Sequence, residues 1–350
     1  MRIVVTGATG NVGTSVVEAL VADPAVDEIV GLARRLPRWQ PPRTRWVQAD
    51  VATDALEPHF AGADAVIHLA WLIQPSRDGA ALRAVNVDGS RRVFEAAARA
   101  GAGALVHASS VGVYSPGPKD RRVDESWPRE GVAASFYSRH KAAAERALDA
   151  VQAQAPGLRV VRLRPGLIFK REAGAEVRRL FAGPFLPARL LKPGRVPVLP
   201  LPARLVLQAV HGDDVGEAYR LAALSPTAEG AYNVAADPVL DPATLARVFR
   251  ARHVDFPARV LRALADASWR ARLQPTPSGW LDMGLAVPLM DTRRAREQLG
   301  WTPRHSSVAA LEELLAGMRE PAGMETAPLD PHAGGPLRIR ELLTGIGKRT

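Results

Sequence analysis

A glycine-rich turn near the start of the chain limits its fold more than any other feature. The run VTGATGNVG places Gly7, Gly10 and Gly13 between an apolar segment at 2–6 and a segment at 12–22 with helical apolar spacing. Such a turn needs residues without a Cβ atom, because the backbone bends tightly and approaches a phosphate closely. Free N–H groups at the start of the helix then favour a bound diphosphate. The sequence therefore predicts a strand, a phosphate-binding turn and a helix.

Strands and helices alternate through the first half of the chain. Further strands are predicted at 28–33, 45–50, 64–70, 104–110 and 159–165, and long helices at 79–100 and 135–154. The near-continuous apolar character of these strands is typical of parallel strands that are covered on both faces. We therefore predict an α/β fold with a doubly wound parallel sheet of the Rossmann type, whose ligand lies at the carboxyl ends of the strands.

The second half of the chain has a less regular pattern. Residues 181–205 are too rich in Pro for regular elements and predict a lobe that covers the substrate. The elements expected after this lobe are a strand at 205–211, a helix capped by Asp213 or Asp214, a strand at 230–235, and helices within 241–273 and 291–318. We find no internal repeat.

Two changes of pattern predict the domain boundaries. Residues 1–168 form the Rossmann core, and residues 169–318 are mainly a smaller C-terminal substrate-binding lobe. The strands at 205–211 and 230–235 are expected to return toward the core. Residues 319–350 read as a flexible tail, in which PLRIRELLTGI is more simply disordered than helical.

Composition excludes several classes of function. None of the 350 residues is Cys, so disulfides, thiolate metal sites and thiol nucleophiles are excluded. The net charge of +10 comes from Arg residues scattered through every segment, which indicates a compositional bias rather than a nucleic-acid site. No apolar run is long enough to span a membrane and no leader is recognisable, so a cytoplasmic protein is expected. The His residues lack paired spacing with carboxylates, so no metal site is predicted.

Residues near the ends of the first four strands predict a nicotinamide dinucleotide site. Arg34 and Arg35 follow the second strand, where NAD-binding proteins place an acid, and a guanidinium pairs well with the 2′-phosphate of NADP. NADP is therefore favoured, and NAD stays open. Asp50 is placed to meet the adenine amine, with Val51 against the ring. The residues expected at this site are Gly7, Thr9, Gly10, Asn11, Val12, Gly13, Arg34, Arg35, Asp50, Val51, Leu69 and Ala70.

The run FYSRHK places Tyr137 and Lys141 one turn apart on the same face of a helix. A nearby ammonium and an oxidised nicotinamide would both lower the pKa of a phenol from about 10, so that Tyr137 exchanges a proton with a substrate alcohol. Lys141 would also bond the nicotinamide ribose. Ser110, at the end of the fifth strand, would hold the substrate oxygen. Asn86 is a candidate for ordering a proton-relaying water, and an ordinary helix-surface role is equally open.

The motifs together resemble a known superfamily. The chain resembles the extended short-chain dehydrogenase/reductases in the order and spacing of its motifs. These motifs are TGATGNVG, ADV, HLA, NVDGSRRVFEAA, HASSVGVY, YSRHK, LRPG, VHGDDV and YNVA. The similarity is greatest to the NAD-dependent epimerase/dehydratase branch and covers roughly residues 1–315. It implies Ser110, Tyr137 and Lys141 as a catalytic triad and Pro165 beside the nicotinamide carboxamide. Family members also form dimers, which suggests a homodimer through helices 79–100 and 135–154, brought close by Ala142, Ala143 and Ala144.

Departures from the family pattern narrow the reaction. Val111 and Gly112 stand where the sugar 4,6-dehydratases carry an Asp-Glu pair, so that dehydration is disfavoured. Leu207 stands where many nucleotide-sugar enzymes carry a diphosphate-binding Arg, although Arg204 is near in sequence.

Trp71, Leu72 and Ile73 make the expected crevice apolar, which favours a less polar small molecule, and simple packing is the open alternative. The candidate substrate contacts are Trp71, Val111, Arg204 and His211. For His211, a hydrogen-bonded structural role at a strand end is the simpler interpretation.

The leading hypothesis is an NADP-preferring oxidoreductase that moves hydride between a nicotinamide and a secondary alcohol or ketone. The first alternative is a nucleotide-sugar 4-epimerase that retains NAD. The second is a non-catalytic regulator that senses NADP(H), which the intact Ser-Tyr-Lys set disfavours.

Overall fold

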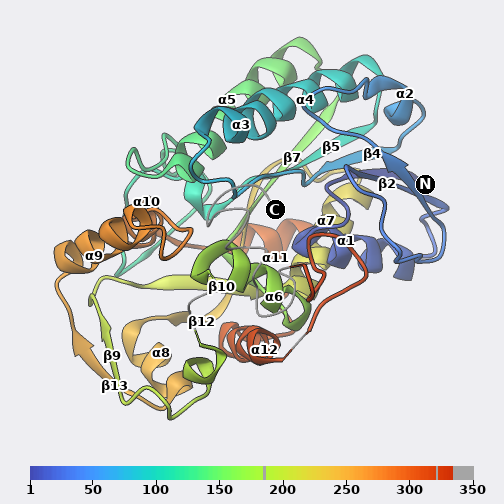
Figure 1. The fold of residues 1–350 in the computed structure, drawn as a ribbon. Helices are drawn as coiled ribbons and strands as arrows, with labels where there is room; N and C mark the ends of the chain where they lie inside the picture. Colours follow the sequence, from blue (N-terminus) through green and yellow to red (C-terminus); the bar gives the residue numbers. More distant parts are fainter. Residues whose placement is uncertain (184–186, 321, 334–350) are drawn as a thin grey trace.

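Seven parallel strands form the main sheet of the computed structural model, which describes residues 1–183, 187–320 and 322–333 (Figure 1). The strand order is β11-β7-β5-β4-β1-β2-β3. Their bounds are β1 Arg2–Thr6, β2 Glu28–Ala33, β3 Thr44–Gln48, β4 Ala65–His68, β5 Ala104–Ala108, β7 Arg159–Pro165 and β11 Gly230–Val234. The predicted doubly wound sheet is confirmed. The strand order reverses between β1 and β4, so the carboxyl ends of these strands diverge into a crevice.

Helices cover both faces of this sheet (Figure 1). On one face lie α1 (Asn11–Ala22) and α7 (Gly212–Leu224), which share a fully buried cluster with the strands. On the other face lie α4 (Ser90–Arg99) and α5 (Phe136–Gln154), whose Phe94 and Leu148 are fully buried. Both faces of the central strands are therefore buried, which explains their near-continuous apolar sequence, whereas the edge strand β3 is partly exposed.

The predicted helix at 79–100 has an irregular centre. It consists of α3 (Gly79–Arg83), a π-helical turn at Ala84–Gly89 and α4. Side chains within the wide turn are committed to neighbouring elements: Asn86 bonds the backbone of Leu72, and the Ser90 hydroxyl donates to the Asn86 carbonyl at 2.8 Å. The wide turn thus ties this helix to the segment that follows β4.

Smaller sheets and short helices make up most of the remaining chain. The strands are β6 Arg122–Val123, β8 Leu167–Phe169, β9 Val198–Leu201, β10 Leu207–His211, β12 Ala236–Leu240, β13 Arg252–Asp255 and β14 Leu289–Met290. The helices are α2 Glu57–Phe60, α6 Gly174–Val177, α8 Pro242–Phe249, α9 Ala258–Arg270, α10 Gly279–Ala286, α11 Arg293–Leu299 and α12 Ser307–Arg319. Short turns of 3-10 or π helix lie at Val111–Val113, Arg171–Ala173, Arg178–Ala182 and Ala188–Leu191. No helix within the described segments is long and apolar enough to cross a bilayer.

Two helical predictions for this half were too long. Within 241–273, α8 ends at Arg250 in the left-handed conformation, and β13 then pairs with β9 before α9 begins. The Pro-rich stretch at 181–205 therefore contributes a strand, which we did not expect. Within 291–318, the chain turns at Gly300 (φ 65°) between α11 and α12. Periodicity alone did not show these left-handed breaks.

The cap prediction for α7 needs correction, and the two strands that flank this helix lie in different sheets. β11 joins the main sheet, whereas β10 pairs with β8 and β12 in a separate three-stranded sheet, although its Val210 belongs to the same buried cluster as the main sheet. The cap of α7 is His211, whose Nδ1 accepts the N–H of Asp213 at 3.2 Å, rather than Asp213 or Asp214. The Asp214 carboxylate instead accepts the N–H groups of Arg304 and His305, each at 3.0 Å. It thus anchors the turn before α12.

Side-chain burial removes one argument for a dimer. Ala142 and Ala144 are buried in the chain's own core, so they cannot form a small exposed face for close helix approach. A homodimer through α4 and α5 stays a prediction. After α12, Leu329 is fully buried, and the carbonyl of Glu325 accepts the N–H groups of Arg38 and Trp39. The last part of the predicted tail, 334–350 with PLRIRELLTGI, lies outside the described residues, and the domain boundaries remain a prediction.

Candidate active site

The three glycines of the first turn differ in how much space a Cβ atom would find at their positions. Gly7 has φ +71°, and a Cβ atom on it would lie 2.6 Å from the Ala70 nitrogen. A Cβ on Gly13 would lie 2.3 Å from the carbonyl oxygen of Gly7. At Gly10, however, a Cβ would keep 3.6 Å from its nearest neighbour, which is ordinary contact. The fold itself therefore requires Gly7 and Gly13, whereas Gly10 leaves open space beside the helix N-terminus.

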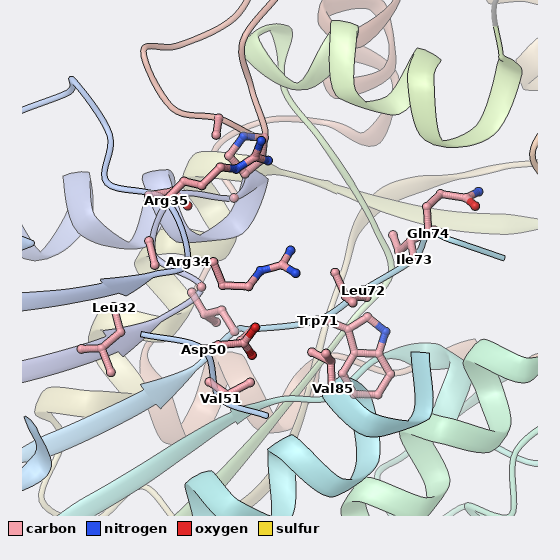
Figure 2. A pocket seen from close by; sticks show the side chains of 18 of the residues that line it. Leu32, Arg34, Arg35, Asp50, Val51, Trp71, Leu72, Ile73, Gln74 and Val85 are labelled. Carbon is pink, nitrogen blue, oxygen red and sulfur yellow. The ribbon is translucent and has the colours of Figure 1, made fainter. Parts of the chain in front are cut away.

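A cavity of about 240 Å³ lies at the carboxyl ends of β1, β2 and β4 (Figure 2). Most residues predicted for the cofactor line it, and Trp71 from the predicted substrate set does so too. They are Gly7, Thr9, Gly10, Arg34, Arg35, Asp50, Val51, Leu69 and Ala70. In Figure 2 Arg34 extends into the cavity above Asp50. The sequence analysis did not identify Gln74, Glu176, Arg179 or Pro328, which line the cavity from the loop after β4, from the lobe and from the segment after α12.

Other residues of the predicted cofactor set lie outside the cavity lining. Gly13 lies behind the turn, and Val12 packs on the core of α1. Asn11 donates from Nδ2 to the carbonyl of Ile168 at 3.3 Å, while its Oδ1 is buried without a hydrogen-bond partner. Pro165 is buried at the end of β7. The glycine turn at the start of α1, with Gly7 and Gly10 in the cavity lining, fits a bound dinucleotide, whose phosphates would meet the free N–H groups of the helix.

The three predicted triad residues come together beyond Trp71. Tyr137 lies in the first turn of α5, a helix that begins where the Ser135 hydroxyl accepts the N–H of Ser138. The side chain of Ser110, which follows β5, lies close enough to the hydroxyl of Tyr137 to lower its pKa. The Lys141 ammonium donates to the carbonyl of Ala108 at 2.7 Å. The strand end and the helix thus place all three groups at one point.

The pKa values of this pair differ from the expectation. Burial of the hydroxyl raises the pKa of Tyr137 to about 12, and the nearby Ser110 side chain offsets only part of that rise. Burial also lowers the pKa of Lys141 to about 7, against the opposing charge of Glu145. The expected lowering of the Tyr137 pKa by Lys141 is therefore wrong for the cofactor-free chain. In this state desolvation is the dominant cause, and it keeps the phenol of Tyr137 protonated.

Aromatic rings surround Tyr137. The Trp71 ring meets it edge-on at a centroid distance of 5.8 Å, and the Trp280 ring lies against it at 4.8 Å with a tilt of 37°. Trp71 also lies 3.4 Å beneath the Lys141 ammonium, in a cation–π contact. Trp71 thus stands between the cavity of Figure 2 and the triad. Trp280 belongs to no motif, so only the fold could place it here.

A buried ion pair supports the triad from below. Arg164 on β7 donates to both carboxylate oxygens of Glu145 on α5, at 2.9 and 2.7 Å. Arg164 also donates to the hydroxyl of Tyr114, which donates to the Asn233 side chain at 2.6 Å. Burial would raise the pKa of Glu145, but the bonds and charge of Arg164 outweigh it and hold that pKa below its usual range. This network fixes α5 against the sheet, one turn beyond Lys141.

The remaining predicted residues have structural partners. Both ends of the Asn86 amide bond the Leu72 backbone, at 2.7 and 2.8 Å. These contacts position the loop after β4 and give no support to the water-ordering role, which stays a prediction. Val111 and Tyr137 pack against the same buried cluster, and the role of Val111 as a substrate contact stays a prediction. Arg204 is exposed and does not line the cavity.

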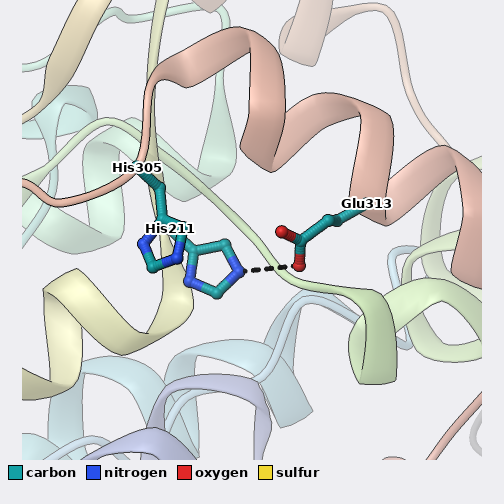
Figure 3. Close-up of side chains that lie close together, drawn as sticks. All are labelled: His211, His305 and Glu313. Carbon is teal, nitrogen blue, oxygen red and sulfur yellow. Dashed lines mark hydrogen bonds and ion pairs between the residues drawn. The ribbon is translucent and has the colours of Figure 1, made fainter.

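His211 lies in a cluster that its sequence spacing did not indicate. Its ring stacks on His305 at a centroid distance of 4.1 Å, and its Nε2 lies 3.1 Å from Glu313 (Figure 3). Three potential metal ligands therefore do converge, from β10, the turn before α12 and α12 itself, contrary to the spacing argument. Because Nδ1 accepts the Asp213 N–H, Nε2 carries the proton and donates it to Glu313. Both ring nitrogens of His211 thus have protein partners, and the cluster serves to join α12 to the start of α7.

The fold and the site define a dinucleotide-binding enzyme of the epimerase and reductase type. Residues 3–235 match the NAD dependent epimerase/dehydratase family, and the chain belongs to this family. An uncharacterized protein of Mycobacterium tuberculosis is 28% identical over 326 residues, which are 93% of this chain and 31% of that protein. The chain thus spans about a third of the length of the curated relatives that it matches first.

Two further similarities concern proteins of stated activity. A 4-hydroxy-2-methyl-3-oxo-4-farnesyl-3,4-dihydroquinoline-1-oxide ketoreductase of Stigmatella aurantiaca is 31% identical over 173 residues, covering 48% of this chain and 51% of that protein. The structure of a Thermus thermophilus UDP-glucose 4-epimerase in complex with NAD superposes with a TM-score of 0.66 and 23% identity. That superposition covers 91% of this chain and 99% of the epimerase, and it shows the shared fold.

Proposed function

We propose that this protein is an NADPH-dependent reductase of a ketone, with Ser110, Tyr137 and Lys141 as its catalytic residues. The observation that carries the proposal is geometric: Tyr137 lies beside Ser110 and Lys141 and is enclosed by the rings of Trp71 and Trp280. Reduction needs a proton donor at the carbonyl oxygen, and a neutral phenol beside Ser110 can serve as that acid. The reverse oxidation would need a tyrosinate.

Each residue has one task in the proposed reaction. The hydroxyls of Ser110 and Tyr137 hold the carbonyl oxygen, and Tyr137 gives that oxygen its proton. Lys141, whose ammonium lies 5.7 Å from the centroid of the Tyr137 ring, holds the nicotinamide ribose. When bound, the reduced nicotinamide supplies the hydride that the carbonyl carbon accepts. The ketone therefore becomes a secondary alcohol, and the dinucleotide leaves oxidised.

The adenosine end of the cavity supports NADPH as the reductant. Arg34 and Arg35 both line this end, and neither Ala33 nor any neighbour on β2 offers a carboxylate to a ribose hydroxyl. Two guanidinium groups there match a 2′-phosphate. Asp50 lines the same end, where its carboxylate would meet the adenine amine.

The alternative is a nucleotide-sugar 4-epimerase that retains NAD. The Thermus thermophilus epimerase is similar in fold, which makes this alternative the appropriate competitor. The surroundings of Tyr137 favour a less polar substrate, because Trp71 and Trp280 enclose it. The Stigmatella aurantiaca relative, named for reduction of a ketone in a farnesylated quinoline compound, points the same way.

One experiment separates the two reactions. Purified protein is analysed for bound nucleotide and then mixed with NADPH and an alicyclic ketone, 2-decalone. We expect no tightly held NAD, and one NADPH oxidised for each molecule of alcohol formed. Retained NAD, no net NADPH oxidation and interconversion of UDP-glucose with UDP-galactose would establish the epimerase instead.

A further inference from the structure

Aromatic side chains are concentrated around Tyr137 to a degree that the composition does not predict. Phe, Trp and Tyr make up only 5% of the chain. Five of them nevertheless converge on this point from four segments. They are Trp71 after β4, Phe136 and Tyr137 on α5, Phe181 in the π turn at 178–182 and Trp280 on α10. Phe181 meets the Trp280 ring edge-on at 5.0 Å, so the Trp280 ring is held from two sides.

The position of Trp280 is built into the backbone. A Cβ on the preceding residue, Gly279, would lie 2.4 Å from the carbonyl oxygen of Ala134, so glycine lets α10 approach the start of α5. Met283, one turn later on α10, is buried beside Gly112. Hydrogen bonds also fix the segment that carries Phe181: the Thr276 hydroxyl donates to its carbonyl at 2.7 Å. These contacts hold an aromatic wall in place beside the catalytic hydroxyl.

Two buried donors of this wall lack partners. The indole nitrogens of Trp71 and Trp280 are buried and make no hydrogen bond within the described part of the chain. Four other Trp residues do have acceptors: Trp46 donates to Trp39, Trp127 to Ser115, Trp269 to Ser76 and Trp301 to Asp214. Buried indole N–H groups normally find a partner, and both exceptions flank Tyr137. A bound molecule with oxygen acceptors would supply the missing partners.

The opposite side of the crevice does not suit a diphosphate. The side chains of Leu205 and Leu207 lie against Gly284 of α10, and Arg204 between β9 and β10 is exposed. Half-buried Lys119, whose ammonium lies beside Val206 and Gly284, already donates to the carbonyls of these two residues, both at 2.8 Å. A charged nucleotide would therefore lose hydration here without gaining a cationic partner.

We infer that the substrate of this reductase is a flat aromatic carbonyl compound, bound with its ring against Trp280 and its carbonyl oxygen at Tyr137. This inference rests on the proposed function and specifies its substrate class. An aromatic ring beside indole gains more than its apolar area alone provides, because offset and edge-to-face pairs are favourable. A saturated ring of the same size gains only the area term. Trp280 is thus the residue that sets the specificity.

The test uses two ketones of one skeleton, 2-tetralone with a benzene ring and 2-decalone without it. The readout is the ratio of kcat/KM for 2-tetralone to that for 2-decalone. In Trp280→Leu we expect this ratio to fall about tenfold, since the aromatic pair is lost. Trp280→Phe keeps a ring and should retain most of the ratio. Trp46→Leu is the matched control, because its indole lies on β3 beside Trp39, away from the triad, and it should leave the ratio unchanged.

The outcomes distinguish this inference from the proposed function. Reduction of both ketones with a ratio that Trp280→Leu does not change overturns the aromatic subsite and leaves the reductase intact. Binding of NADPH without reduction of either ketone overturns the proposed function, and the inference with it. If Trp280→Leu does not fold, Trp280→Phe alone provides the test. A fall of more than threefold in its ratio of kcat/KM for 2-tetralone to that for 2-decalone would contradict stacking as the source of specificity, because the variant keeps an aromatic ring.

Discussion

The two ends of the cleft are built in different ways. At the adenosine end, a contiguous motif and the ends of neighbouring strands supply the lining, with Arg34, Arg35 and Asp50 around an open cavity. At the catalytic end, Trp71 and Trp280 close on Tyr137 from segments more than 140 residues apart in sequence. The first end carries charged side chains, and the second is lined by half-buried aromatic rings. Cofactor choice and substrate choice should therefore respond to different substitutions.

The largest effect is expected at the catalytic end. Tyr137→Phe removes the proton donor but keeps the ring between Trp71 and Trp280. We expect kcat for ketone reduction to fall by about 10³-fold, the usual range for loss of a general acid. The dissociation constant for NADPH, measured by fluorescence, should change less than about threefold, because the adenosine end is untouched. Retained turnover would remove Tyr137 from proton transfer.

The ion pair beneath the catalytic end should matter most for stability. Glu145→Gln leaves the Arg164 guanidinium buried without its charge partner, so we expect a loss of about 3 kcal/mol in the free energy of unfolding. Urea denaturation at pH 7 measures it. The matched control is Glu130→Gln, which removes an exposed ion pair with Arg146 on the same helix and should cost about 0.5 kcal/mol or less.

The same pair has a defined pH dependence. The pKa of Glu145 is lower in the folded chain than its ordinary value of 4.5. Its contribution to stability is therefore complete above the unfolded pKa and is lost as the pH falls through the folded pKa. The difference between wild type and Glu145→Gln should stay constant from pH 8 to pH 6 and shrink below about pH 4.5. A difference that grows on acidification would contradict the assigned charges.

The glycine turn allows a comparison within one motif. Gly13→Ala forces a Cβ against the carbonyl oxygen of Gly7, so we expect a loss of about 2 kcal/mol in stability even without ligand. Gly10→Ala meets only ordinary contacts and should leave the cofactor-free stability within about 0.5 kcal/mol. It should nevertheless weaken NADPH binding, because the new methyl group stands where the phosphates approach the helix. Equal melting temperatures for the two variants would contradict this division.

The smallest effect is expected at the adenosine end. Arg34→Ala and Arg35→Ala should each reduce the preference for NADPH over NADH by about tenfold, since each removes a charged partner of the 2′-phosphate. Steady-state KM values for the two cofactors give this ratio. Arg38→Ala is the control, because Arg38 belongs to the same exposed loop but does not line the cavity. A similar loss for both cofactors would show that the two Arg residues hold the loop and do not select the phosphate.

The features that the sequence predicted correctly are those that short local motifs encode. The parallel sheet, the glycine turn and the meeting of Ser110 with Tyr137 follow from motifs at the ends of strands, and the structure contains them. It did not indicate the break of the helix at Arg250 or the strand β9 inside a Pro-rich run, because both depend on pairing between distant segments. Trp280 was missed for the same reason: its role comes from α10 packing on α5, and no short pattern records that contact.

Electrostatic expectations failed where burial was unknown. A Tyr and a Lys one turn apart predict a lowered phenol pKa, but the structure buries both groups and raises the pKa of Tyr137 to about 12. The sequence around His211 likewise did not indicate that its ring packs against His305, which lies 94 residues later in the chain. Spacing shows which groups can meet, whereas desolvation depends on everything packed around them.

The central claim is that Tyr137 donates a proton while a ketone is reduced by NADPH. The most direct test follows deuterium from NADPH dideuterated at nicotinamide C4 into the product of 2-tetralone reduction, by mass spectrometry. We predict one deuterium at the carbinol carbon for each NADPH consumed by the wild type, and no labelled alcohol with Tyr137→Phe. Absence of label from the wild-type product, or equal labelling by the Phe variant, would contradict the account.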